Sequence, residues 1–227
     1  MCGRFTLRSP SRLKFDGMVN SRLASRAPRY NIAPSQEILT ITESQDRRDV
    51  CSFVWGLIPS WSKEPKGFIN ARCETLEDKP SFSESFRSRR CLIPADGFYE
   101  WKRTGKTKQP YYFQLTDETP FAFAGIWDEW RRDGISIASC SIITTTPNDL
   151  LAAIHDRMPV ILTPEGQATW LHIDTRITEL RKLLVPFPSY DMKSHPVSQN
   201  VNHAQAEDAQ LVEPIDLSQQ VTNLSLF

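Results

Sequence analysis

The sequence predicts an α+β fold in which a largely antiparallel, curved or barrel-like sheet carries a few peripheral helices. Strand-like runs, rich in β-branched and aromatic residues, follow one another along most of the chain. The regular alternation of strand and helix that builds a parallel sheet is absent. With 227 residues, of which 40% are hydrophobic, the chain suits one generous globular domain or two small ones.

The first half of the chain reads as one short helix followed by loops and strands. Apolar residues after Ser9-Pro10 recur at helical spacing and predict a short helix; they are Leu13, Phe15, Met18, Val19 and Leu23. Residues 29–34 form a loop, because the residue before a proline avoids the helical region. Alternation and β-branched content predict strands over residues 37–42, 50–57 and 68–75.

The second half combines further strands with three more short helices. A helix is expected over residues 80–90, where Phe82 and Phe86 stand four apart, and a hairpin turn over residues 103–106. Further strands are predicted over residues 111–115, 121–127 and 135–146, the last of them central, and a late strand ends at residues 194–198. Helices are expected over residues 150–154, 163–171 and 177–184, and a loosely held tail from Ile215.

Cysteine usage and charge exclude several classes of protein. Five cysteines at irregular spacing fit neither a disulfide framework nor a zinc site, and Cys51, Cys91 and Cys140 are most simply buried thiols. No charged leader or membrane-length apolar run is present, so we expect a cytoplasmic protein. Residues 1–108 hold 20 Lys and Arg against 12 Asp and Glu, and residues 109–227 hold 7 against 15. This asymmetry predicts either a basic face for phosphates or halves that interleave in the fold.

The first four residues, Met1-Cys2-Gly3-Arg4, carry the chemistry around which the chain is organised. A small second residue permits removal of Met1, which would leave Cys2 with a free α-amine beside its thiol. Both groups are partly deprotonated near neutral pH. Such an aminothiol traps aldehydes: the amine forms a Schiff base and the thiolate closes a five-membered thiazolidine. The alternative is that Cys2 is an accident of the second codon.

Polar groups within apolar strands mark a second set of candidates. Asn70, Arg72 and Glu74 alternate along one predicted strand and therefore share a face, which fits either a site or a plain exposed surface. Trp61, on a proline-stiffened loop, is either a base-stacking side chain or a hydrophobic plug.

Two titratable residues fit acid–base roles. Glu100 lies between two aromatic residues at an expected strand end, where partial burial would raise its pKa; the alternative is a salt bridge. His155 stands beside an aspartate and an arginine in a loop before a strand, and fits either an acid–base or a structural role.

Seven motifs in order resemble the SRAP family, the SOS-response-associated peptidases understood as abasic-site-processing proteins. They are MCGRF, YNIAP, WGLIPSW, INARCET, ADGFYEW, IHDRMPVIL and HPVS. The resemblance covers about residues 1–214, which leaves residues 215–227 as a tail. It also implies that the sheet closes into a barrel.

The resemblance implies a role for each candidate residue. Cys2 would crosslink to the ring-opened aldehyde of an abasic site in single-stranded DNA, in a cytoplasmic, nucleoid-associated and monomeric protein without metal or cofactor. Asn70 would contact the sugar, Glu100 would orient the α-amine and shuttle protons, and His155 would act in closing or reopening the ring. The DNA-binding residues implied are Arg4, Asn31, Pro34, Trp61 and Arg72, with the two arginines on phosphates and Trp61 against a base.

Other functions remain open at the level of sequence. The family name points to a peptidase, which we interpret as self-removal of Met1. A non-covalent reader of single-stranded DNA and an N-terminal-nucleophile hydrolase are the alternatives. Some relatives have paired tryptophans where this chain has Trp61 followed by Ser62, so the wedge against duplex DNA is expected to be weaker.

Overall fold

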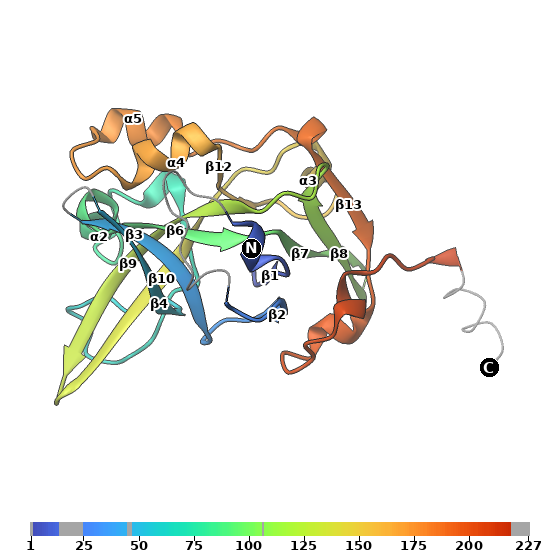
Figure 1. The fold of residues 1–227 in the computed structure, drawn as a ribbon, viewed down its shortest axis with the longest axis horizontal. Helices are drawn as coiled ribbons and strands as arrows, with labels where there is room; N and C mark the ends of the chain where they lie inside the picture. The colour runs from blue at the N-terminus through green and yellow to red at the C-terminus, as the bar shows by residue number, and fades with distance from the viewer. Residues whose placement is uncertain (1, 14–24, 45–46, 106, 219–227) are drawn as a thin grey trace.

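The fold consists of two sheets that share the chain's interior (Figure 1). The protein is described from a computed structural model, and the structure describes residues 2–13, 25–44, 47–105 and 107–218. The helices are few and short, which confirms the predicted α+β class. The longest of them has eight residues, far short of the roughly 20 that a membrane-spanning helix needs.

The first sheet has five strands in the order β13-β8-β7-β1-β2, all paired antiparallel. Its strands are β1 (Arg4–Leu7), β2 (Arg29–Ile32), β7 (Gly97–Thr104), β8 (Thr107–Leu115) and β13 (Met192–Pro196). The chain's first strand thus lies inside the sheet, between β7 and β2.

The second sheet closes on itself. Pairing runs from β10 to β4, β3, β6, β9 and back to β10, so these strands form a ring, as the predicted barrel-like sheet requires. The ring consists of β3 (Glu37–Ser44), β4 (Arg47–Trp55), β6 (Arg90–Ala95), β9 (Phe121–Arg132) and β10 (Ile135–Thr145). Short strands β5 (Asn70–Arg72), β11 (Met158–Pro159) and β12 (Ile161–Leu162) add to it. Two pairings, β10 with β4 and β10 with β5, are parallel.

The helices begin where capping residues place them. Asn148 accepts from the backbone N–H of Leu151 and starts α3 (Asp149–Ala152), and Thr163 caps α4 (Pro164–Leu171) with a proline in the first turn. The remaining α-helices are α2 (Ser83–Ser88) and α5 (Ile177–Lys182). The 3-10 segments are Pro10–Arg12, Cys73–Thr75, Ser189–Asp191, Gln199–Asn202 and Ala209–Val212.

Three predictions change at the level of elements. The predicted strand over residues 68–75 is wrong beyond Arg72, because Cys73–Thr75 turn into a 3-10 helix. Of the predicted helix after Ser9, the structure describes only the 3-10 turn Pro10–Arg12; residues 14–24 and most of the predicted tail lie outside the described residues. Cys91 and Cys140 are buried free thiols, but Cys51 is only partly buried.

The main core fills the space between the two sheets. Phe5 of β1 packs edge-on against Trp55 of β4 and Phe123 of β9, which are ring strands. Phe98 of β7 stacks on Phe113 and also contacts Phe123. Aromatic pairs of this kind add to the free energy of apolar burial, so β1 and β7 are held rigidly against the ring.

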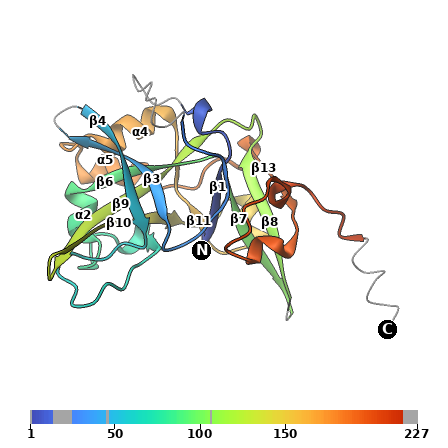
Figure 2. The ribbon, with the colours of Figure 1, turned by 60° about the horizontal axis from the view of Figure 1, so that its bottom comes forward.

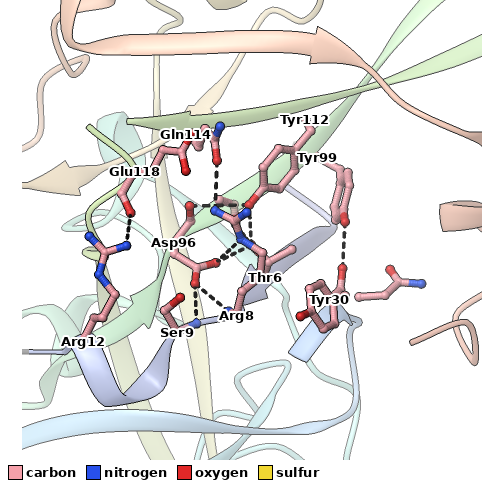
Figure 3. Close-up of polar contacts among 12 residues, drawn as sticks. Thr6, Arg8, Ser9, Arg12, Tyr30, Asp96, Tyr99, Tyr112, Gln114 and Glu118 are labelled. Atoms are coloured by element: carbon pink, nitrogen blue, oxygen red, sulfur yellow. Dashed lines mark hydrogen bonds and ion pairs between the residues drawn. The ribbon is translucent and has the colours of Figure 1, made fainter. Parts of the chain in front are cut away.

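Asp96 joins the two sheets, since it lies between β6 of the ring and β7 of the five-stranded sheet. Its buried carboxylate accepts hydrogen bonds from the Thr6 hydroxyl at 2.6 Å and the Ser9 backbone N–H at 2.8 Å (Figure 3). It also accepts from the backbone of Arg8 and pairs with the Arg8 side chain at 3.4 Å. This network fixes β1, and therefore the residues just before it, against β7.

Candidate active site

Cys2 lies two residues before β1, deep in the protein. The strand pairs antiparallel with β7 so that Arg4 lies opposite Tyr99, which brings the preceding residues alongside Glu100. The Cys2 side chain is fully buried, and its thiol donates to the Arg4 carbonyl at 3.7 Å. Burial raises the pKa of the Cys2 thiol, and the nearby charge of Glu100 raises it further. In this arrangement Cys2 is a neutral thiol.

Asn70 holds the backbone at Cys2. It begins β5, which pairs in parallel with β10 so that Asn70 lies beside Ile142. Its side-chain Nδ2 donates to the Cys2 carbonyl at 2.8 Å. Its Oδ1 atom is also buried and has no hydrogen-bond partner among the described residues. An unsatisfied buried acceptor is costly, so this atom is available to a hydroxyl or amine entering the site.

Glu100 contributes a buried carboxyl group from the middle of β7, not from the strand end that the sequence predicts. Its side chain is 2% exposed, and burial raises its pKa, with the nearby charge of His155 among the opposing influences. A carboxyl group whose pKa is raised retains its proton to higher pH, which suits proton transfer near neutrality.

His155 reaches the same place from the loop after α3. Its backbone N–H donates to the Leu151 carbonyl at 2.9 Å, which continues the last helical turn. The ring Nδ1 accepts from the Arg157 backbone N–H at 3.0 Å and lies 3.0 Å from the Asp156 carboxylate. The neutral ring then carries its proton on Nε2. Cys2, Asn70, Glu100 and His155, which the sequence offers as separate candidates, therefore meet at one site.

A cavity of about 560 Å³ opens at Glu100 and His155. Its other walls include Trp101, Arg103 and Lys108 of the β7–β8 hairpin, where β7 runs on beyond the end of β1. Trp101 is oriented by a hydrogen bond from its indole N–H to Asn202 at 2.8 Å. Sequence reasoning took this hairpin only as a turn, although its basic composition was a usable signal.

The two arginines expected to hold phosphates occupy different environments. Arg4 is partly buried, donates to the Gly3 carbonyl at 2.9 Å and has its pKa lowered by burial; its Nε atom has no partner among the described residues. Arg72 is exposed and stands two residues beyond Asn70 on β5, so both side chains share a face.

Glu74 leaves the face that the sequence assigned to it. It lies in the 3-10 segment after β5 and forms a bidentate pair with Arg157, at 2.6 and 2.9 Å. This pairing lowers the pKa of Glu74 and anchors Arg157, which also donates to the Thr144 carbonyl. Its neighbour Cys73 lines a separate cavity of about 270 Å³.

Asn31 is a structural residue in this fold. It is fully buried in β2, and its side-chain amide donates to the carbonyl oxygens of Val201, His203 and Ala206. The predicted direct contact with DNA therefore does not fit its position, because no part of the side chain faces solvent. It holds the segment that carries Asn202 to the cavity wall.

Pro34 and Trp61 lie on loops around the site. Pro34 is partly buried in the turn after β2. Trp61 is 64% exposed, and its indole N–H lies 3.4 Å from the Pro80 carbonyl. Together with Lys63, Lys66 and Phe68 it lines a shallow cavity of about 430 Å³. The exposure excludes the alternative that Trp61 is a plug in the core.

No arrangement suited to a metal ion is found within the described ranges, since no three His, Cys, Asp or Glu side chains come together. The chemistry of the described site therefore depends on a thiol, a carboxyl group, an imidazole and an amide.

Comparison with known proteins places this site in a family. The family described as SOS response associated peptidase (SRAP) matches residues 1–204. The abasic site processing protein YoqW of Bacillus subtilis is 44% identical over 226 residues, which cover 94% of this chain and 99% of that protein. The abasic site processing protein HMCES of Xenopus tropicalis is 31% identical and aligns with 85% of this chain and 68% of its own length. A crystal structure of a protein from Bacteroides thetaiotaomicron matches with a TM-score of 0.83 and 30% identity over 95% of this chain and all of that one. The chain therefore belongs to the SRAP family.

Proposed function

We propose that this protein recognises abasic sites in single-stranded DNA and joins them covalently to Cys2 as a thiazolidine. The observation that carries the proposal is the convergence of Cys2 with Asn70, Glu100 and His155 at one cavity. Relatives that align over most of the chain are named abasic site processing proteins, which supports the choice of DNA lesion.

The reaction balances without an added oxidant or cofactor. After loss of Met1, the α-amine of Cys2 adds to the C1′ aldehyde of the opened sugar, and the carbinolamine loses one water to give an imine. The thiol sulfur then bonds to the imine carbon, and its proton passes to the nitrogen. Holding both nucleophiles on one residue makes the second step intramolecular, which favours ring closure.

Glu100 and His155 supply the proton transfers in this scheme. A Glu100 carboxyl group with a raised pKa donates the proton that lets the carbinolamine oxygen leave as water. His155, close enough to Glu100 for their charges to interact, returns a proton as the ring closes or reopens. Asn70 keeps the Cys2 backbone in place through its bond to the Cys2 carbonyl.

Access to the sulfur requires a change from the arrangement described here. Cys2 is fully buried, whereas a DNA aldehyde has to reach its sulfur. Removal of Met1 is the processing step closest to this position, and we assign it to the same thiol and acid–base groups, in line with the family's name.

DNA contacts follow from charge and exposure. Arg4 and Arg72 flank the reactive centre and carry the positive charge that phosphates need. Trp61 offers an exposed aromatic face on which a base can stack, with Lys63 and Lys66 beside it. Pro34 stiffens the turn next to β2, and Asn31 contributes through the segment that it holds.

Replacing Cys2 separates the amine's role from the thiol's. We expect wild type to form a heat-stable adduct with single-stranded DNA carrying one abasic site, and Cys2→Ala to lose it to background. Cys2→Ala keeps an α-amine once Met1 is removed, so borohydride should still trap its imine with the same DNA. Denaturing gels measure the adducts, and intact mass reports whether Met1 is absent. Cys73→Ser is the matched thiol control and should crosslink like wild type.

The opposite result is equally clear. Wild type that has lost Met1 but gives no heat-stable adduct would refute the crosslinking function. Turnover of a peptide or acyl substrate that depends on Cys2 would then favour a hydrolase, and salt-sensitive DNA binding that is independent of Cys2 would favour a non-covalent reader.

A further inference from the structure

The β7–β8 hairpin presents two like charges directly opposite each other. The register of the strands sets Arg103 against Lys108, and both residues are exposed. Like charges facing each other across an antiparallel pair destabilise the hairpin. Across the described residues, neither side chain forms an ion pair or a hydrogen bond. The pair therefore has no compensating partner within the described structure.

Both side chains line the cavity that opens at Glu100 and His155. The cavity's other acidic residue, Asp156, lies against the His155 ring at 3.0 Å and forms no ion pair with the hairpin. The positive charge of the hairpin is thus directed at the cavity without being neutralised there, which is the arrangement that an anionic ligand requires.

We infer that Arg103 and Lys108 form a clamp for a backbone phosphate of the DNA strand whose lesion reacts at Cys2. This inference rests on the proposed function for its ligand. The guanidinium offers a fork of donors that matches phosphate oxygens, and the lysine adds a compact charge from the facing strand.

The position of the clamp sets which phosphate it holds. Three residues of extended strand separate Arg103 from Glu100, a distance of about 10 Å. Successive phosphates along one strand are at least about 3.4 Å apart. The clamped phosphate therefore lies roughly one to three nucleotides from the lesion, on one side only, whereas Arg4 and Arg72 serve the phosphates next to the reacting sugar.

Equilibrium binding tests the clamp independently of crosslinking. The ligand is a single-stranded oligonucleotide with one tetrahydrofuran abasic analogue, which has no aldehyde, and fluorescence anisotropy measures the Kd over a range of salt concentrations. For the double variant Arg103→Gln/Lys108→Gln we expect severalfold weaker binding. The slope of log K against log salt should fall by about 1.4, because two contacts to a single strand are lost at about 0.7 each. Arg176→Gln/Lys182→Gln on α5 removes the same charge outside the cavity and should leave the slope unchanged.

Shortening the oligonucleotide on one side of the lesion locates the contact. Wild type should lose affinity when the clamped nucleotides are removed, and the double variant should be indifferent to that truncation. An unchanged salt slope, additive effects of truncation and variant on both sides, an equal effect in the α5 control, or no binding by wild type would overturn the clamp. These outcomes are read from the unreactive analogue, so a wild type that crosslinks normally does not rescue the clamp, and one that fails to crosslink does not refute it.

Discussion

Glu100 is the residue whose ionisation should be visible in the stability of the whole protein. Its pKa in the folded state is raised by burial above the ordinary value of 4.5. Between the unfolded and folded pKa the native protein binds more protons than the unfolded chain, so stability falls as pH rises through that window.

Glu100→Gln cannot ionise and should escape this loss. Relative to wild type, we expect the variant to be more stable at about pH 8 than at about pH 4, with the difference growing as pH rises past the unfolded pKa. Urea unfolding of both proteins at the two pH values measures it. A stability difference that does not change with pH would mean that Glu100 is ordinary in its titration. The same variant should crosslink more slowly, because an amide cannot donate the proton of a carboxyl group.

Asn31 makes a second prediction at the scale of one residue. Asn31→Ala removes the amide that satisfies three buried or partly buried carbonyl groups, and we expect unfolding free energy to fall by about 1–3 kcal/mol. Asn202→Ala, at an exposed residue of the same segment, should change stability by no more than about 0.5 kcal/mol. Denaturant unfolding compares the two. If Asn31→Ala proves as mild as Asn202→Ala, the amide does not anchor this segment.

At the scale of elements, the contact between β7 and β8 depends on a glycine. A Cβ atom at Gly97 would lie 2.0 Å from the hydroxyl of Tyr112, which is buried and 2.8 Å from the Thr6 hydroxyl (Figure 3). Gly97→Ala should therefore cost at least about 3 kcal/mol, at the upper end for overpacking, and weaken the hold on β1. Gly166→Ala, whose nearest contact would be 3.3 Å in α4, is the control and should be close to neutral. Thermal unfolding distinguishes them; equal melting temperatures would show that β7 shifts freely.

Elements with local signals could be predicted from the sequence, and elements set by distant partners could not. Alternation predicted β3, and Thr163 with Pro164 predicted the start of α4. The end of β5 was missed because Glu74 turns away to pair with Arg157, which is 83 residues further along the chain. The same holds for the site: motif resemblance identified Cys2 and its partners, but the role of Asn31 depends on carbonyl groups about 170 residues away.

At the scale of the whole molecule, the charge asymmetry of the sequence does not separate in space. Strands of both halves pair in the ring, where β6 lies between β3 and β9, and in the five-stranded sheet, where β13 adds to β8. The halves therefore interleave, which favours the second interpretation of the charge pattern. Positive charge at the cavity is a local property of the β7–β8 hairpin (Figure 2).

The position of β1 between β7 and β2 has a mechanical consequence. A chain terminus is ordinarily the first part of a protein to yield to a pull, but here the residues after Cys2 are hydrogen-bonded along both edges and fixed to Asp96. If DNA is joined at Cys2, a motor drawing on the strand would have to extract an inner strand of the sheet. The joint would then yield only with the unfolding of the sheet, and an unfolding protease would be better placed to clear it than a translocating helicase.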